Sequence, residues 1–160
     1  MIMILQKIKD LSLDWLERLD RKRVIMDRQC DEPLLTRYYL FLKDRKRFPF
    51  NVFLHKFHKG DPGDVHDHPW PYATLILKGG YYEWIPKFNS IGKNIGEERM
   101  WRGPGHFRLC GATSYHRIEL CEGVTPWTLF MPGPHKREWG FLVDNKWIHN
   151  DNYLEANKQH

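Results

Sequence analysis

The chain has 160 residues, of which 41% are hydrophobic and 14% aromatic, and its formal net charge is +5. This length predicts a single domain over residues 1–160 that buries its own core, and the aromatic content excludes a largely disordered chain. No apolar run approaches the roughly 20 residues of a membrane-spanning helix, and the apolar start at 1–5 lacks a following cleavage site, which argues against a secretory signal.

The three cysteines, Cys30, Cys110 and Cys121, form no CxxC pair. An odd number of cysteines without metal-type spacing predicts reduced thiols and a cytoplasmic location, and it argues against a cysteine zinc site. The basic residues occur in short clusters, which are more typical of a solvated surface than of a nucleic-acid site. We therefore expect neither nucleic acid nor a membrane as the partner.

Residues 1–34 are predicted to be an N-terminal helical segment. Leu5, Ile8, Leu11, Trp15 and Leu19 recur at steps of three and four residues, which places them on one face of an α-helix. We expect this apolar face to pack on the segment that follows.

Short runs rich in β-branched and aromatic residues follow, separated by turns that contain glycine and proline. These runs are 36–43, 51–58, 73–77, 81–85, 98–102, 107–109, 116–120, 127–131 and 139–143. Many short strands at close spacing, with no helices between them, predict an antiparallel sandwich or barrel over residues 35–148. Residues 149–160 are expected to be a C-terminal tail with a short helix at 153–157.

Two histidines, His66 and His68, stand two residues apart. In an extended chain such residues point to the same face, so their imidazoles can bind one metal ion. A His-x-His pair alone is more often an ordinary polar loop. His116, however, opens an apolar strand and shares its parity with Ile118 and Leu120. A third histidine that points inward is what a metal site in the mouth of a barrel requires.

The spacing of these histidines resembles the first motif of the cupins. Gly60 is followed after five residues by His66-x-His68 and then by a glycine at 79 or 80, and His116 falls where a second motif supplies another histidine. The resemblance covers residues 51–131. It implies an all-β, antiparallel cupin-like barrel (a double-stranded β-helix or jelly roll), here with an N-terminal α-helix, that holds one divalent metal ion at His66, His68 and His116.

The sequence departs from the cupin pattern at two places. Tyr72 or Ala73 replaces the glutamate ligand, and the second motif lacks its Pro-x-Gly and has Leu120 in place of asparagine. An all-histidine site resembles those of thiol dioxygenases and diketone-cleaving dioxygenases. That resemblance implies Fe(II), O2 and an anionic substrate, and it leaves Zn, Ni, Mn and Cu open as the metal.

Several other residues are candidates for roles around the metal. Tyr72 stands near the missing carboxylate, and His58 ends the strand before the histidine pair, so both are candidate catalytic residues. His55 has the opposite parity to His58, so at most one of the two faces the pocket. Candidate substrate contacts are Arg37, Tyr39, Arg117 and Trp127. Arg37 is preferred for pairing with a carboxylate or phosphate, although most aromatic residues of a small barrel belong to its core.

Asp67 lies between the two histidines and is expected to face away from the metal, with a role in a turn or behind the ligands. This placement disfavours the pattern of the 2-oxoglutarate oxygenases, in which the carboxylate stands one residue later.

The sequence therefore predicts a metal-binding cupin, a mononuclear non-haem iron enzyme of the dioxygenase type that acts on a small anionic substrate. One alternative is a non-oxidative isomerase, epimerase or lyase that acts on a sugar or sugar-nucleotide, with Tyr72 or His58 as the base. A second alternative is a ligand-binding cupin without catalysis. The helix and the exposed strand edges also favour a homodimer.

Overall fold

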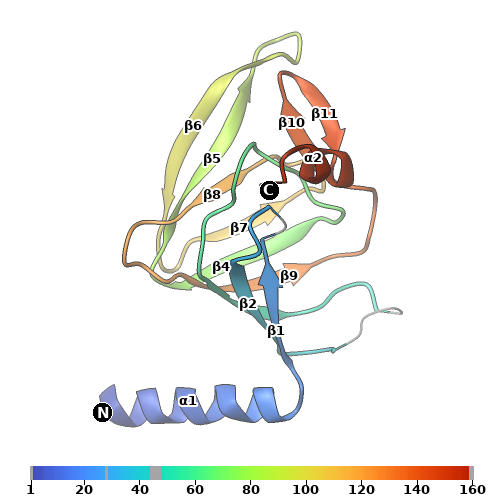
Figure 1. Ribbon diagram of the computed structural model, residues 1–160. Helices are drawn as coiled ribbons and strands as arrows, with labels where there is room; N and C mark the ends of the chain where they lie inside the picture. The colour runs from blue at the N-terminus through green and yellow to red at the C-terminus, as the bar shows by residue number, and fades with distance from the viewer. Residues whose placement is uncertain (1, 28, 44–47, 159–160) are drawn as a thin grey trace.

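The computed structural model describes residues 2–27, 29–43 and 48–158, with the side chains of the first helix described from Asp10 onward. Figure 1 shows strands gathered in sheets, with one helix at each end of the chain. In order, the elements are α1 (Ile2–Arg18), β1 (Lys22–Met26), β2 (Pro33–Tyr39), β3 (Phe53–Phe57), β4 (Tyr72–Lys78), β5 (Tyr81–Phe88), β6 (Asn94–Arg102), β7 (Phe107–Cys110), β8 (Arg117–Glu119), β9 (Trp127–Pro132), β10 (Gly140–Val143), β11 (Lys146–His149) and α2 (Asn150–Ala156).

Each strand expected from the sequence has a counterpart, and two further strands were not predicted. β1 lies within the segment expected to be helical, where its arginine and lysine obscure a short apolar run. β11 pairs with β10 through a two-residue turn in which Asp144 and Asn145 have φ of 47° and 65°. Asp and Asn tolerate this left-handed backbone, which matches the twist of a tight hairpin.

All the strand pairs are antiparallel. A six-stranded sheet has the order β1-β2-β3-β9-β4-β7, a three-stranded sheet has the order β6-β5-β8, and β10 pairs with β11. The central strands bury alternate residues: in β3, Phe53, His55 and Phe57 are buried, whereas Leu54 and Lys56 are half-buried. This period of two gives the larger sheet an inner face that packs against the smaller sheet.

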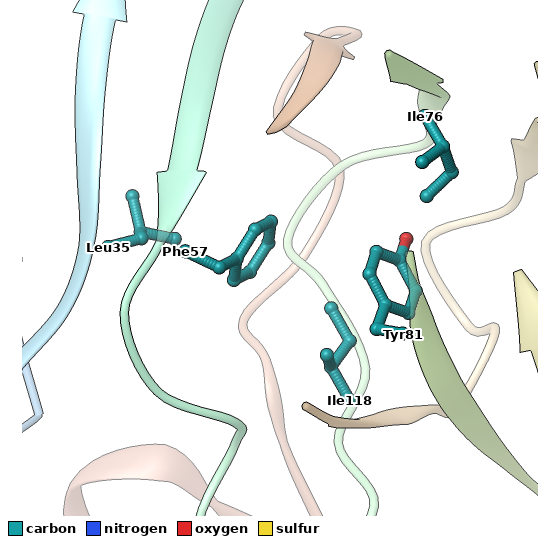
Figure 2. Close-up of a cluster of buried hydrophobic side chains, with 5 residues drawn as sticks. All are labelled: Leu35, Phe57, Ile76, Tyr81 and Ile118. Atoms are coloured by element: carbon teal, nitrogen blue, oxygen red, sulfur yellow. The ribbon is translucent and has the colours of Figure 1, made fainter. Parts of the chain in front are cut away.

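The main core lies between the two larger sheets. Leu35, Phe57 and Ile76 come from the six-stranded sheet, and Tyr81 and Ile118 come from the three-stranded sheet. Figure 2 shows the Phe57 ring directed toward Tyr81, whose hydroxyl points toward Ile76, and the two ring centroids are 5.9 Å apart. A smaller cluster joins β10 to α2 through Phe141, Tyr153 and Leu154. The two larger sheets are thus held together by apolar side chains that each sheet contributes to the main core.

Replacing Ile76 with Ala is expected to lower the free energy of unfolding by about 2–5 kcal/mol, because it removes buried methyl groups and leaves a cavity. Ile76 is 1% exposed, whereas its neighbour Leu77 on the outer face of the same strand is 45% exposed. Leu77→Ala is therefore the matched control, with an expected effect below about 1 kcal/mol. Urea unfolding measures both values, and equal losses in the two variants would contradict this assignment of the core.

The apolar face of α1 does not pack on the following segment, contrary to expectation. Leu11, Trp15 and Leu19 are 62%, 61% and 46% exposed, and the side chains of Leu5 and Ile8 lie outside the described residues. Only residues 19–21 separate α1 from β1, which pairs with β2 at the sheet edge. This short connection leaves the helix beside the sheets, as Figure 1 shows.

Among the described residues, no helix has both the length and the apolar character needed to cross a membrane.

Candidate metal centre

The three predicted ligands come from two loops that the backbone joins directly. His66 and His68 precede β4, and His116 precedes β8. The amide N–H of His66 donates to the carbonyl of His116 at 2.9 Å, and the amide N–H of His116 donates to the carbonyl of His66 at 2.9 Å. One potential ligand atom from each of the three imidazoles lies within 4.8 Å of the other two. The structure therefore brings together the histidines that the sequence predicts.

The geometry of this cluster fits one divalent ion. The Nε2 atoms of His68 and His116 are 2.8 Å apart, close to the about 2.9 Å between two nitrogens that bind one ion at right angles with bonds of about 2.0–2.1 Å. Nδ1 of His66 is buried and has no hydrogen-bond partner within the described ranges. A buried polar atom without a partner calls for a ligand, and three imidazoles are a donor set that suits Zn, Fe, Ni and Cu.

Burial keeps two of these imidazoles neutral. Desolvation lowers the pKa of His66 to about 4, with His116 adding to the effect and Asp61 opposing it. Desolvation also holds the pKa of His68 well below its usual value, and the neighbouring His116 and His66 lower it further. At neutral pH both rings therefore keep the lone pairs that a metal ion needs.

Glu83 on β5 is a residue of the site that the sequence analysis missed. Its side chain is buried, and its Oε1 lies 2.9 Å from Nδ1 of His116. Arg102 donates to Oε2 at 2.8 Å, and Arg108 also pairs with this oxygen. Because Nδ1–H of His116 donates to the carboxylate, Nε2 is left to bind a metal. The available signal was the alternation along the strand, since Glu83 stands two residues after the buried Tyr81 and therefore points to the same face.

Glu83 is ionised despite its burial. Desolvation raises its pKa, but the hydrogen bonds from His116 and Arg102 and the positive charge of Arg108 outweigh that effect and lower the pKa to about 2. A carboxylate behind His116 fixes the orientation and the tautomer of the ring. The chain thus places a carboxylate behind a ligand, whereas the cupin pattern uses a carboxylate as a ligand.

Asp67 faces away from the cluster, as predicted, and holds the His-x-His loop to the C-terminal strands. The side chain is 0% exposed, and its Oδ1 accepts from the backbone N–H of Gly140 at 2.8 Å. Its Oδ2 accepts from Trp147 Nε1 at 3.2 Å and pairs with Arg137 at 2.8 Å. These bonds anchor the loop from behind, while its two histidines face inward.

A cavity of about 600 Å³ opens beside the three histidines. Tyr72 lines it at the histidine end, with its hydroxyl 3.4 Å from Nε2 of His116 and its ring centroid 4.6 Å from that of His68. Arg37 and His55 line it as well, and Arg37 Nε donates to His55 Nε2 at 3.0 Å. The predicted anion contact and the predicted tyrosine therefore share one cavity with the candidate ligands.

The structure brings His55 to the cavity and leaves His58 outside it. His58 is exposed, its Nε2 lies 2.8 Å from Thr36 Oγ1, and it lines a separate depression on the outer side of β2 and β3. The cause is the alternation of side chains along the strand. Residues 55 and 58 are three apart, so they point to opposite faces, and only one of these faces is turned to the cavity. The predicted position of His58 beside the ligands is therefore wrong, and His55 is the histidine of the two that lines the cavity.

Three of the candidate substrate contacts also lie outside the cavity lining. Tyr39 packs edge-on against Phe53. Arg117 pairs with Glu97 at 3.4 Å and covers the ring of Trp84. Trp127 is buried and stacks on Tyr38. Arg117 and Trp127 have the outward parity of their strands, and Tyr39 ends β2 beyond the cavity. Of the predicted set, Arg37 remains in contact with the cavity.

Lowering the pH below 6.5 is expected to destabilise the protein through His55. Burial and the Arg37 guanidinium hold the pKa of His55 well below 6.5, its usual value in an unfolded chain. The folded state thus binds fewer protons than the unfolded state, so the stability that neutral His55 contributes is present above pH 6.5 and is lost as the pH falls.

Urea unfolding with a chelator present, between pH 7.5 and 5, tests this pH dependence. His55→Gln should unfold with a smaller pH dependence than the unmodified chain, and His135→Gln, which changes an exposed imidazole, should not alter it. An unchanged slope in His55→Gln would contradict the prediction.

Comparisons with known proteins show the fold. No protein-family model matches the sequence, and no curated protein matches it. The polyketide cyclase RemF from Streptomyces resistomycificus is similar with a TM-score of 0.57 and 14% identity, over 83% of this chain and 87% of that chain. A cupin-2 domain from Rhodospirillum rubrum is similar with a TM-score of 0.57 and 12% identity, over 84% and 80%.

The enzyme HppE, solved with Fe(II) and the alternative substrate (S)-1-HPP, has a TM-score of 0.50 and 9% identity, over 71% of this chain and 56% of that chain. The chain therefore has the cupin fold, as the spacing of its histidines implied, with a three-histidine cluster inside it.

Proposed function

We propose that this chain is a metal-dependent enzyme that holds one divalent cation at His66, His68 and His116 and acts on a small anionic molecule. The observation that carries the proposal is the convergence of three imidazoles from two loops, with ligand atoms within 4.8 Å of one another, at one end of a cavity of about 600 Å³. Cavities of this size accommodate small-molecule substrates. A bound divalent ion supplies Lewis-acid chemistry and, as iron, redox chemistry with O2.

The residues of the chain have separate roles in this proposal. Glu83 holds His116 in the tautomer that leaves Nε2 available. Tyr72 places a hydroxyl beside the ligands, where it can donate a hydrogen bond to a bound substrate. Arg37 lines the same cavity and attracts an anionic group. The site thus combines ligands, a proton donor and a cation in one enclosed space.

Fe(II) and a dioxygenase-type reaction are the preferred form of this proposal. Three neutral ligands leave the charge of a divalent ion uncompensated, which favours an anionic substrate, and they leave further coordination positions for substrate and O2 together. The Fe(II)-containing structure of HppE, which has the same fold, supports iron.

A non-oxidative reaction is the second candidate, and the fold shared with a polyketide cyclase favours it. In that reaction Tyr72 would serve as the acid or base. Oxygen dependence separates the two candidates: turnover under strict anaerobiosis supports the non-oxidative reaction, and consumption of O2 that follows substrate supports the dioxygenase. A large fall in melting temperature on chelation, with no turnover of any substrate tested, would support a ligand-binding protein without catalysis.

Metal analysis of protein purified without a histidine tag tests the proposal directly. We expect close to one equivalent of a divalent metal per chain, with iron retained under anaerobic purification, and we expect His66→Ala to lose it. A content far below one equivalent for every divalent metal, unchanged in His66→Ala, would overturn the proposal.

The cytoplasmic location and the homodimer predicted from the sequence stay predictions. Fractionation of cells and sedimentation velocity at several protein concentrations test them.

A further inference from the structure

A row of aromatic rings crosses the inner face of the six-stranded sheet. His55 on β3, Phe130 on β9 and Tyr72 on β4 form this ring row. The centroids of His55 and Phe130 are 5.1 Å apart with an interplanar angle of 20°, and those of Phe130 and Tyr72 are 5.1 Å apart with an angle of 28°. The row forms because β9 lies between β3 and β4, so rings from three separate parts of the sequence stand side by side.

The two ends of the ring row differ in chemistry. At the His55 end, Arg37 Nε donates to His55 at 3.0 Å, which fixes the guanidinium at the cavity wall. At the Tyr72 end, the tyrosine ring lies 4.6 Å from His68 and its hydroxyl lies 3.4 Å from His116. The row therefore runs from a cation to the three-histidine cluster, across two ring spacings.

The charged side chains that line the cavity include two carboxylates, Asp61 and Glu83, and two arginines, Arg23 and Arg37. Asp61 Oδ2 accepts from the backbone N–H of Ile118 at 2.8 Å. Glu83 is held by His116 and by two arginines. Arg37, which also lies over the ring of Phe53 at 4.5 Å, brings a positive charge to the His55 end of the ring row, where it can pair with an anionic group.

The walls between these ends are apolar and suited to a flat ligand. Within the ring row, Phe130 stacks between the other two rings. The ring edges remain for a ligand along the row, and edge-to-face contact is a preferred geometry between aromatic groups. Other parts of the cavity wall are formed by Leu35, Phe57 and Ile118. A planar aromatic body thus fits between the ring edges and this apolar wall.

We propose that the substrate class is a fused two-ring aromatic acid, with the acid group at Arg37 and a polar substituent at the three-histidine cluster. This inference rests on the proposed function for the role of the metal end. Arg37 would recognise the acid, and the ring row would recognise the aromatic rings. Both are properties of the chain itself, so this recognition can be measured apart from the metal.

Binding of 6-hydroxy-2-naphthoate, followed by isothermal titration calorimetry, tests this assignment. We expect measurable binding to the metal-loaded chain and weaker binding to the chelated chain. We expect at least tenfold weaker binding for 2-naphthol, which lacks the acid, for 4-hydroxybenzoate, which lacks the second ring, and for 8-hydroxyoctanoate, which lacks the rings. Arg37→Gln should weaken binding of the naphthoate at least tenfold, and Arg37→Lys should restore part of it.

Arg117→Gln is the matched control, because Arg117 lies outside the cavity lining and pairs with Glu97. It should leave the affinity unchanged. Phe130→Leu keeps an apolar side chain while removing the middle of the ring row, and it should weaken the naphthoate but not 8-hydroxyoctanoate. Circular dichroism and thermal unfolding confirm that each variant folds.

Several results would overturn the inference. Equal affinities for the naphthoate and 2-naphthol, an affinity unchanged by Arg37→Gln in a folded variant, or equal affinities for the aromatic and aliphatic acids would each do so. Metal binding without naphthoate binding would remove this inference alone. Naphthoate binding that depends on Arg37 in a chain that binds no metal would instead remove the proposed function and leave this one standing.

Discussion

Replacing His116 with Gln is expected to abolish tight metal binding. His116 is the proposed ligand that joins the two loops of the site, and its Nε2 lies 2.8 Å from that of His68. The substitution leaves two imidazoles, too few to compete with water for a divalent ion. We expect affinity to fall by more than about 100-fold, the upper end of the cost of losing a hydrogen-bond partner behind a ligand.

Anaerobic titration with Fe(II), and separately with Zn(II), measures this loss. His58→Gln is the control, because this exposed histidine hydrogen-bonds to Thr36 on the outer face, and it should bind metal as the unmodified chain does. Thermal unfolding with chelator shows whether His116→Gln is folded. Full metal affinity in a folded His116→Gln chain would mean that the metal binds elsewhere.

Replacing Glu83 with Ala is expected to destabilise the protein by about 3–5 kcal/mol, the cost of breaking a buried ion pair by removing one partner. Glu83 is 2% exposed, and Arg102 and Arg108 converge on its carboxylate. Without it, two guanidinium groups face the interior with no counter-charge. Glu83→Gln keeps a hydrogen-bond acceptor and should cost less.

Glu83→Gln should also weaken metal binding by about 10–100-fold, because the charge behind His116 is lost. Glu119→Gln is the matched control. Glu119 pairs with Arg99 at 2.6 Å on the surface of the neighbouring strand, and exposed pairs of this kind contribute about 0–1 kcal/mol. Urea unfolding with chelator, and metal titration of the same samples, give both values. Equal stability of Glu83→Ala and Glu119→Gln would contradict the burial of this pair.

Local patterns were sufficient to predict most of the strands and the three candidate ligands. Alternation along a strand depends only on the pleat, so the inward direction of His116 and the outward direction of Asp67 could be derived from neighbouring residues. The same reasoning failed for His58, because parity restricted the choice to one of two histidines without saying which face would be inside.

The N-terminal helix shows that a local pattern does not predict where a helix packs. An apolar stripe indicates a face suited to burial, but Trp15 on that face is 61% exposed. The pairing of β1 with β2 at the edge of the six-stranded sheet leaves the helix beside the sheets. Pairing between strands is a long-range choice, and the helical pattern by itself contains no information about it.

The sequence by itself determined that this chain is an antiparallel β protein with a histidine pair and a third histidine on inward faces, since alternation and turn residues act over a few positions. Only the tertiary structure decided that Glu83 stands behind His116 and that His55, Phe130 and Tyr72 form one row from Arg37 to the cluster. These contacts join strands far apart in the sequence. They follow from the order in which the strands pair, which depends on how all the inner faces pack together.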